Sequence, residues 1–127
     1  MKKLLFTAVV LCIAGLTFAQ QAGFKRTLLQ TNDLSISDKV VVQAIAEFGP
    51  GVAAGRHTHP GEEIGYVMEG QIEIKIDGQP SQLIPAGKTF FIPKGLVHDG
   101  INTTSGTSKV LATYVVEKGK PVATPAP

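Results

Sequence analysis

The chain concentrates its imidazole and carboxylate groups in two short segments. The stretch GVAAGRHTHPGEEIGYVMEG contains His57 and His59, and the third histidine, His98, follows a second turn in PKGLVH. His57 and His59 are two residues apart, so on a strand their side chains project from the same face. The Pro-Gly turn after them can return Glu63 on a neighbouring strand toward the same point. Because three neutral imidazoles and one carboxylate suit a divalent transition metal, these residues predict a metal site.

Each of these residues taken singly also has an ordinary interpretation. A lone histidine on a strand is more often solvated or hydrogen-bonded than bound to a metal. Glu63 alone is equally compatible with a rim carboxylate, like its neighbour Glu62, and the glycines are compatible with turns alone. The single cysteine, Cys12, lies in an apolar run near the start of the chain, which argues against a closed structural zinc site built from thiolates. Only the spacing of all these residues taken together can distinguish a metal site from these ordinary interpretations.

The joint spacing resembles that of the cupin superfamily, because both motifs of that family have matches here. The first motif, G-x5-H-x-H-x3-E-x6-G, is matched by Gly51, His57, His59, Glu63 and Gly70. The second motif, G-x5-P-x-G-x2-H-x3-N, is matched by Gly87, Pro93, Gly95, His98 and Asn102. Each of these positions is expected by chance at about a few per cent, so coincidence is not a serious competitor. The chain is therefore similar to compact single-domain cupins.

The resemblance implies a fold, a ligand set and a cofactor. The fold would be all-β, a double-stranded β-helix or jelly-roll barrel. His57, His59, Glu63 and His98 would hold one divalent transition metal ion, and none of the four is substituted. Nitrogen and oxygen ligands suit Fe, Mn, Ni, Cu and Zn alike, so the identity of the metal stays open. Four protein ligands leave up to two positions of an octahedral site free for a substrate.

The rest of the chain has the pattern of an all-β protein. Ile72, Ile74 and Ile76 alternate with polar residues, which is typical of a strand with one buried face. An Asp-Gly pair directly after them predicts a hairpin turn. Further strands are expected at Lys39–Phe48, Thr89–Ile92, residues 109–116 and around His98. Many short strands separated by Gly and Pro, without a helical period, indicate a sandwich or barrel.

The first residues have the layout of a secretory signal peptide. Lys2 and Lys3 precede an apolar run that ends at Leu16, and small residues around Ala19 provide a cleavage site. The run is short of the roughly 20 residues that span a bilayer. We therefore expect cleavage of residues 1–19, export to the periplasm or the outside of the cell, and no membrane anchor afterwards. Residues 20–118 are expected to form one barrel domain, and residues 119–127 (GKPVATPAP) a mobile Pro-rich tail.

The charge distribution and the apolar strands indicate which partners the protein could bind. Lys2 and Lys3 supply the whole formal net charge of +2, so the remaining chain is balanced. It has no cluster of Lys and Arg, which makes nucleic acid and anionic membranes poor candidates. A homodimer is expected, because an exposed sheet edge in a domain of this size needs cover and cupins commonly pair through outer strands. The segments Lys39–Phe48 and 109–116 are apolar enough to contribute to that interface.

Similarity to enzymatic cupins implies dioxygenase-like or related metal-dependent chemistry on a small oxygen-rich organic molecule. Glu63 is the candidate catalytic base because it would already lie at the metal. Five residues near the ligands in sequence are candidate pocket residues: Arg56, Glu62, Tyr66, Phe91 and Asp99. A non-catalytic protein that binds a metal or small molecule is the main alternative, and a purely structural barrel is a third. The sequence does not separate these possibilities.

Overall fold

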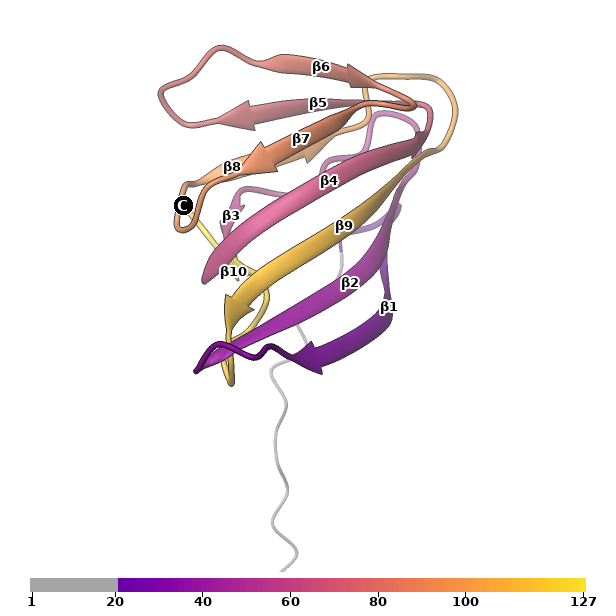
Figure 1. Ribbon diagram of the computed structural model, residues 1–127. Coiled ribbons are helices and arrows are strands. Elements are labelled where there is room, and N and C mark those ends of the chain that lie inside the picture. Colours follow the sequence, from indigo (N-terminus) through magenta and orange to yellow (C-terminus); the bar gives the residue numbers. More distant parts are fainter. Residues whose placement is uncertain (1–20) are drawn as a thin grey trace, which may run out of the picture.

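Two five-stranded sheets make up the fold (Figure 1). The computed structural model describes residues 21–127, so the expected signal peptide lies outside the described residues. The strands are β1 (Phe24–Asp33), β2 (Lys39–Phe48), β3 (His57–Thr58), β4 (Gly61–Glu69), β5 (Gln71–Ile76), β6 (Gln82–Pro85), β7 (Thr89–Ile92), β8 (His98–Ile101), β9 (Ser108–Glu117) and β10 (Thr124–Pro125). Sheet A has the order β1-β2-β9-β4-β7 and sheet B the order β10-β3-β8-β5-β6. Neighbouring strands are antiparallel throughout.

The prediction of an all-β jelly-roll fold is confirmed by these two sheets. Strand β2 has the predicted bounds, and β5, β7, β8 and β9 lie where the alternating and β-branched patterns indicate them. Strand β1 has no counterpart among the predictions, since it is an edge strand exposed along nearly its whole length and shows little apolar alternation. Within residues 21–127 the structure contains no helix long and apolar enough to cross a membrane.

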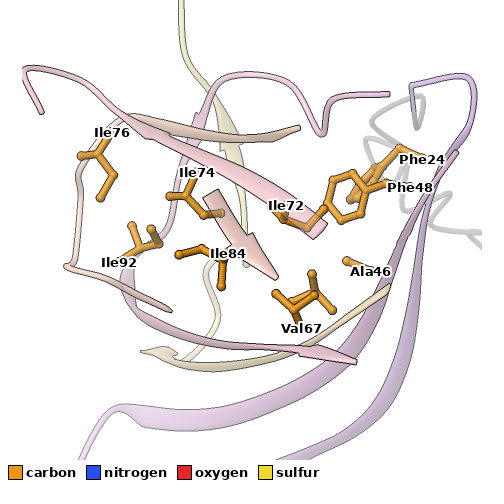
Figure 2. Packing of buried hydrophobic residues seen from close by; sticks show 10 residues of the cluster. Phe24, Ala46, Phe48, Val67, Ile72, Ile74, Ile76, Ile84 and Ile92 are labelled. Atoms are coloured by element: carbon orange, nitrogen blue, oxygen red, sulfur yellow. The ribbon is translucent and has the colours of Figure 1, made fainter. Parts of the chain in front are cut away.

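The hydrophobic core lies between the inner faces of the two sheets. Along β2 and β9 every second residue is buried, as expected for strands with one face on the core. The larger cluster (Figure 2) consists of Phe24, Ala46, Phe48, Val67, Ile72, Ile74, Ile76, Ile84, Ile92 and Val110. A second cluster adjoins the histidines, because the Tyr114 ring centroid lies 4.8 Å from that of His59. Full burial of each large aliphatic side chain stabilises the fold by about 1.5–3 kcal/mol.

Two residues hold the barrel corners next to the histidine segments. At Gly61 an added Cβ would lie 1.9 Å from the carbonyl oxygen of Val115, so only glycine lets β4 approach β9 this closely. The fully buried amide of Asn102 donates to carbonyl oxygens of Phe48, Gly49 and Gly106 at 2.7–3.1 Å. Asn102, the last motif position, therefore satisfies loop carbonyls and does not face the histidines.

The prediction of a mobile tail at residues 119–127 is corrected by the structure. Strand β10 pairs with β3, and Pro125 lies opposite His57 in the register. The Ala126 amide donates to the Arg56 carbonyl at 2.9 Å, and Arg56 Nε donates to the Pro127 carbonyl at 2.8 Å. Without the tail, β3 would be an edge strand with unpaired backbone groups. Proline is compatible with this outermost position because an edge strand needs no inter-strand donor on its open side.

Candidate metal centre

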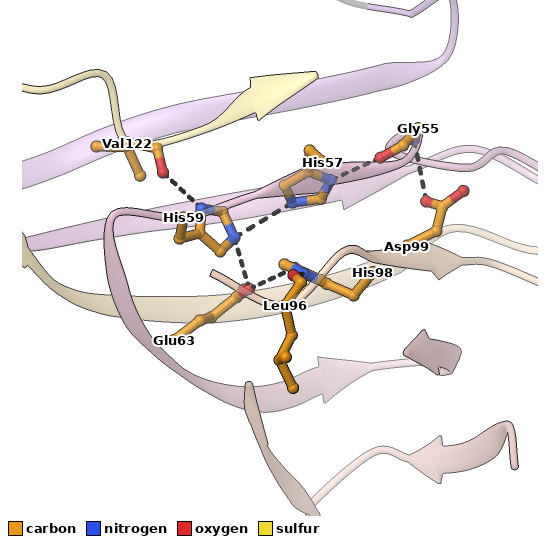
Figure 3. Close-up of polar contacts among 8 residues, drawn as sticks. All are labelled: Gly55, His57, His59, Glu63, Leu96, His98, Asp99 and Val122. Atoms are coloured by element: carbon orange, nitrogen blue, oxygen red, sulfur yellow. Dashed lines mark hydrogen bonds and ion pairs between the residues drawn. The ribbon is translucent and has the colours of Figure 1, made fainter. Parts of the chain in front are cut away.

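Three segments of the chain deliver the candidate ligands to one point (Figure 3). His57 on β3 is paired in register with His98 on β8. His59 and Glu63 stand on either side of the turn that leads from β3 into β4. One ligand atom from each of the four residues lies within 4.8 Å of the other three, and the side chains are buried or nearly so. The structure thus brings together all four residues that the motifs single out.

Hydrogen bonds to the backbone fix the tautomers of the three imidazoles. Each Nδ1 atom faces one carbonyl oxygen: His57 faces Gly55 at 2.6 Å, His59 faces Val122 at 2.5 Å and His98 faces Leu96 at 2.9 Å. A carbonyl oxygen only accepts, so each Nδ1 carries a proton and donates it. In the neutral rings the Nε2 atoms are therefore left with lone pairs.

Four acceptor atoms consequently face one another at the centre of the site. His59 Nε2 lies 3.2 Å from His57 Nε2 and 3.0 Å from Glu63 Oε2, and His98 Nε2 lies 3.4 Å from that same oxygen. The buried Nε2 of His98 has no hydrogen-bond partner among residues 21–127. Buried lone pairs gathered in this way are unfavourable unless a cation lies between them. The donor set therefore fits a divalent transition ion bound through nitrogen and oxygen.

The pKa values of His57 and Glu63 keep these two ligands free of competing protons. Burial is the main cause that lowers the pKa of His57 to about 4. Burial acts to raise the pKa of Glu63, but the adjacent His59 and His98 side chains outweigh it and hold that pKa at about 2. At neutral pH the Glu63 carboxylate is ionised and His57 is neutral, which are the forms that bind metals.

Sequence reasoning missed the contribution of the tail to this site. The Val122 carbonyl, which accepts from His59, belongs to the segment between β9 and β10. Outer partners of this kind orient a ligand ring and fix its tautomer. No side-chain pattern could have revealed Val122, because its role lies in a backbone oxygen 63 residues away from His59.

Three of the predicted pocket residues lie on the outer face of sheet A. Glu63 points inward on β4, so its neighbours Glu62 and Tyr66 point outward by the alternation of a strand. Phe91 is 55% exposed on the same face, opposite Ile64, and its neighbour Phe90 is the ring that points inward. The prediction that these three residues line the pocket is therefore corrected.

The other two predicted pocket residues support the loop that carries His57. Asp99 accepts a hydrogen bond from the Gly55 amide at 3.0 Å, and the Gly55 carbonyl in turn accepts from His57. Burial raises the pKa of Asp99. Arg56 forms two hydrogen bonds with the Asp77 carboxylate, at 2.8 and 3.0 Å, and lines the larger of two cavities beside the site.

Two cavities adjoin the candidate ligands. The smaller has a volume of about 30 Å³ and is bounded by His57, Glu63 and His98 together with the buried ring of Tyr114. The larger has a volume of about 390 Å³, which is within the range of small-molecule pockets. Arg26, which the sequence analysis did not single out, lines both cavities. The sequence feature that could have identified Arg26 is its position two residues after Phe24, which places both side chains on the inner face of β1.

Comparison with known proteins identifies the family. The family model for the Cupin domain matches residues 44–120, more than half of the chain, so the chain belongs to the cupin family. Oxalate oxidase 1 of Hordeum vulgare is 38% identical over 92 residues, which are 66% of this chain and 43% of that protein. The HTH-type transcriptional regulator PuuR of Escherichia coli is 33% identical over 78 residues, which are 61% of this chain and 42% of that protein. The chain thus spans less than half the length of these curated relatives.

Solved structures support the same assignment. A recombinant oxalate oxidase in complex with glycolate aligns with a TM-score of 0.69 and 27% identity, over 84% of this chain and 57% of that chain. A cupin superfamily protein from Desulfitobacterium hafniense aligns with a TM-score of 0.63 and 16% identity, over 78% of this chain and 83% of that chain. At that identity the second likeness shows the shared fold alone.

Replacing His98→Ala should lower the affinity for a divalent ion such as Zn²⁺ by at least about 100-fold, because one of four ligands is lost. The matched control is Glu62→Ala, which removes an outward-pointing carboxylate directly beside a candidate ligand. It should change the affinity less than about threefold. Competition with a chromophoric chelator measures both. Equal effects of the two substitutions would contradict the four-ligand site.

Deleting residues 120–127 should weaken metal binding by about 10- to 100-fold, since His59 loses the acceptor that fixes its ring. The far-UV circular dichroism spectrum should stay that of a β protein, because β10 pairs only with β3. The substitution Arg56→Gln, which releases Pro127 but keeps Val122 in the chain, should have a smaller effect. An affinity unchanged by the deletion would show that the Val122 contact is dispensable.

Proposed function

We propose that this cupin holds one divalent transition metal ion with His57, His59, Glu63 and His98, and acts there on a small oxygen-rich organic molecule in dioxygenase-like or related metal-dependent chemistry. The observation that carries the proposal is the convergence of four acceptor atoms without a donor among them. When bound, such an ion supplies Lewis acidity and lowers the pKa of an oxygen that coordinates it.

Two residues of the site are placed to accept or donate a proton. Glu63 is ionised at neutral pH and lies within the ligand cluster, so it is the group placed to accept a proton from a bound hydroxyl. Its low pKa makes it a weak base that returns the proton readily. The Tyr114 hydroxyl, whose pKa burial raises, stays protonated and presents a donor to the smaller cavity.

The comparisons support this function at the level of chemistry and leave the substrate open. Relatives named oxalate oxidase match two thirds of the chain, and one structural neighbour is an oxalate oxidase in complex with glycolate. The second candidate is a cupin that binds a small molecule without turning it over, and the relative named a transcriptional regulator supports its non-catalytic character. We further propose export to the periplasm or the outside of the cell, on the layout of residues 1–19.

Oxygen uptake separates the enzyme from the binding protein. The protein, loaded in turn with Fe²⁺, Mn²⁺, Ni²⁺, Cu²⁺ or Zn²⁺, is tested against catechols, flavonols, keto acids and small hydroxy acids in an oxygen electrode. We expect uptake with one metal and one substrate class that vanishes with chelator and in His98→Ala. Tight metal binding without turnover of any class would instead assign the non-catalytic function.

A homodimer belongs to the same proposal, and the outer face of sheet A is the surface that a second copy would cover. Ile64, Tyr66, Met68 and Phe91 are each between 44% and 55% exposed on the adjacent strands β4 and β7. Leu111 on β9 extends this patch, since it lies opposite Tyr66. Aromatic residues and methionine are enriched at interfaces, and an apolar patch continuous over several strands is rare on a monomer.

Light scattering of the protein at micromolar concentration should therefore give twice the chain mass. Replacing Phe91→Lys should shift the protein toward the monomer by placing a charge in the patch. The matched control is Leu83→Lys, which alters an equally exposed leucine on β6 in the other sheet and should leave the dimer intact. A monomeric parent protein would overturn this part of the proposal.

A further inference from the structure

Arg26 occupies an unusual position beside the candidate metal centre. It lies on the inner face of β1, opposite Ala46, and its side chain forms part of the wall of both cavities. The guanidinium carbon is 5.6 Å from the ring centroid of Phe24 and 5.7 Å from that of Tyr114. Both separations are within the range of cation–π contacts, which hold the guanidinium in place between the two rings.

The charge of Arg26 has no counterpart in the described part of the chain. No carboxylate of residues 21–127 lies within 4.0 Å of its nitrogen atoms, whereas Arg56 on the same cavity is paired with Asp77. Its Nε is buried and has no hydrogen-bond partner among these residues. A buried donor on a cation is costly when it stays unpaired, and an anion in the cavity would remove this cost.

The charge balance of the neighbouring site also favours an anion. Three neutral imidazoles and the Glu63 carboxylate neutralise only half of the charge of a divalent ion. The Arg26 guanidinium adds a further positive charge across the smaller cavity. A planar guanidinium matches a carboxylate with two parallel hydrogen bonds, which makes a carboxylate the anion that this group recognises best.

The larger cavity limits which carboxylate fits. Besides Arg26, its wall is polar at Gln21, Arg56 and His57 and otherwise formed largely by apolar side chains, those of Phe24, Ala54, Pro121, Val122, Ala123 and Pro125. A bare hydroxy acid or dicarboxylate would leave this apolar surface uncovered. An acid with an apolar body would bury it, with a gain of about 25 cal/mol per Å² of apolar surface.

We propose that Arg26 binds the carboxylate of a monocarboxylic acid whose aromatic or branched apolar body fills the cavity between β1 and the tail. This inference rests on the proposed function, because it names the class of molecule that reaches the candidate metal centre. Arg26 and most of the apolar wall lie outside residues 44–120, the part that matches the family model. The selectivity would therefore come from the segments that flank the matched stretch.

Calorimetric titration of the protein with benzoate and phenylacetate, against benzamide and phenylacetamide, tests the proposal. The amides keep the shape of the acids and lose the charge. At least one acid should bind about ten times more tightly than its amide, and more tightly than glycolate, which has no apolar body. Arg26→Gln should weaken binding of that acid by about 10- to 100-fold and leave the amide unchanged. Arg26→Lys should retain part of the affinity.

The matched control is Lys25→Gln, which removes the same charge one residue away on the outer side of β1, where Lys25 is 69% exposed. It should bind the acid as the parent does. The proposal is overturned if no acid binds more tightly than its amide, if Arg26→Gln binds the acid like the parent, or if Lys25→Gln loses as much affinity. If Arg26→Gln does not fold, the acid-to-amide ratio of the parent and the Arg26→Lys variant decide.

Metal binding is measured separately, so that failure of this inference and failure of the proposed function can be told apart. The titrations are carried out on metal-free and Zn²⁺-loaded protein, and Zn²⁺ affinity is measured by chelator competition. Selective acid binding without metal binding would overturn the metal-dependent function and leave the Arg26 site standing. Tight metal binding without preference for an acid would overturn the Arg26 site alone.

Discussion

The hydrogen bonds from three imidazole Nδ1 atoms to backbone carbonyls determine how the site is built. Each bond forces the lone pair of its ring onto Nε2, and the geometry brings the three lone pairs to the same point as the Glu63 carboxylate (Figure 3). Rings free to flip could relieve the crowding by turning a protonated nitrogen inward. The hydrogen bonds to the carbonyls prevent such flips, so the acceptor atoms stay close together. Their mutual repulsion is unfavourable, and a bound cation would offset it.

This constraint explains features of the fold far from the chemistry. The carbonyls must come from the loops before β3 and β8 and from the tail, so these three segments need fixed positions relative to one another. Register pairing of His57 with His98 fixes the first two. The pairing of β10 with β3 fixes the third, and the contacts of Arg56 tie the tail and Asp77 to the same place. A Pro-rich segment is therefore part of the site.

The sequence predicted residues whose positions follow from spacing along one strand or across one turn. The spacing of His57 and His59 and the turn before Glu63 predicted that these three side chains meet. The second motif added His98. The pocket prediction failed for Tyr66 and Phe91, because proximity in sequence says nothing about which face of a strand a residue occupies. Alternation starting from an inward-pointing Glu63 assigns Tyr66 to the outer face once β4 is recognised as one continuous strand. Alternation places Arg26 on the same face as Phe24 only once β1 is recognised as a strand. Val122 was beyond such reasoning, since its role lies in a backbone oxygen that folding brings to His59.

Metal binding and cavity lining are carried by different segments of the barrel. The four candidate ligands lie inside the stretch that matches the family model, whereas Arg26 and Val122 lie on either side of it. The matching stretch can therefore hold a metal whatever flanks it, provided that some acceptor replaces the Val122 carbonyl. The flanking segments wall the larger cavity and supply its unpaired cation. Changes in β1, or in the tail at positions other than Val122, would then alter which molecule enters without removing a contact of the ligand set, which is a physical route by which one metal-binding barrel serves many chemistries.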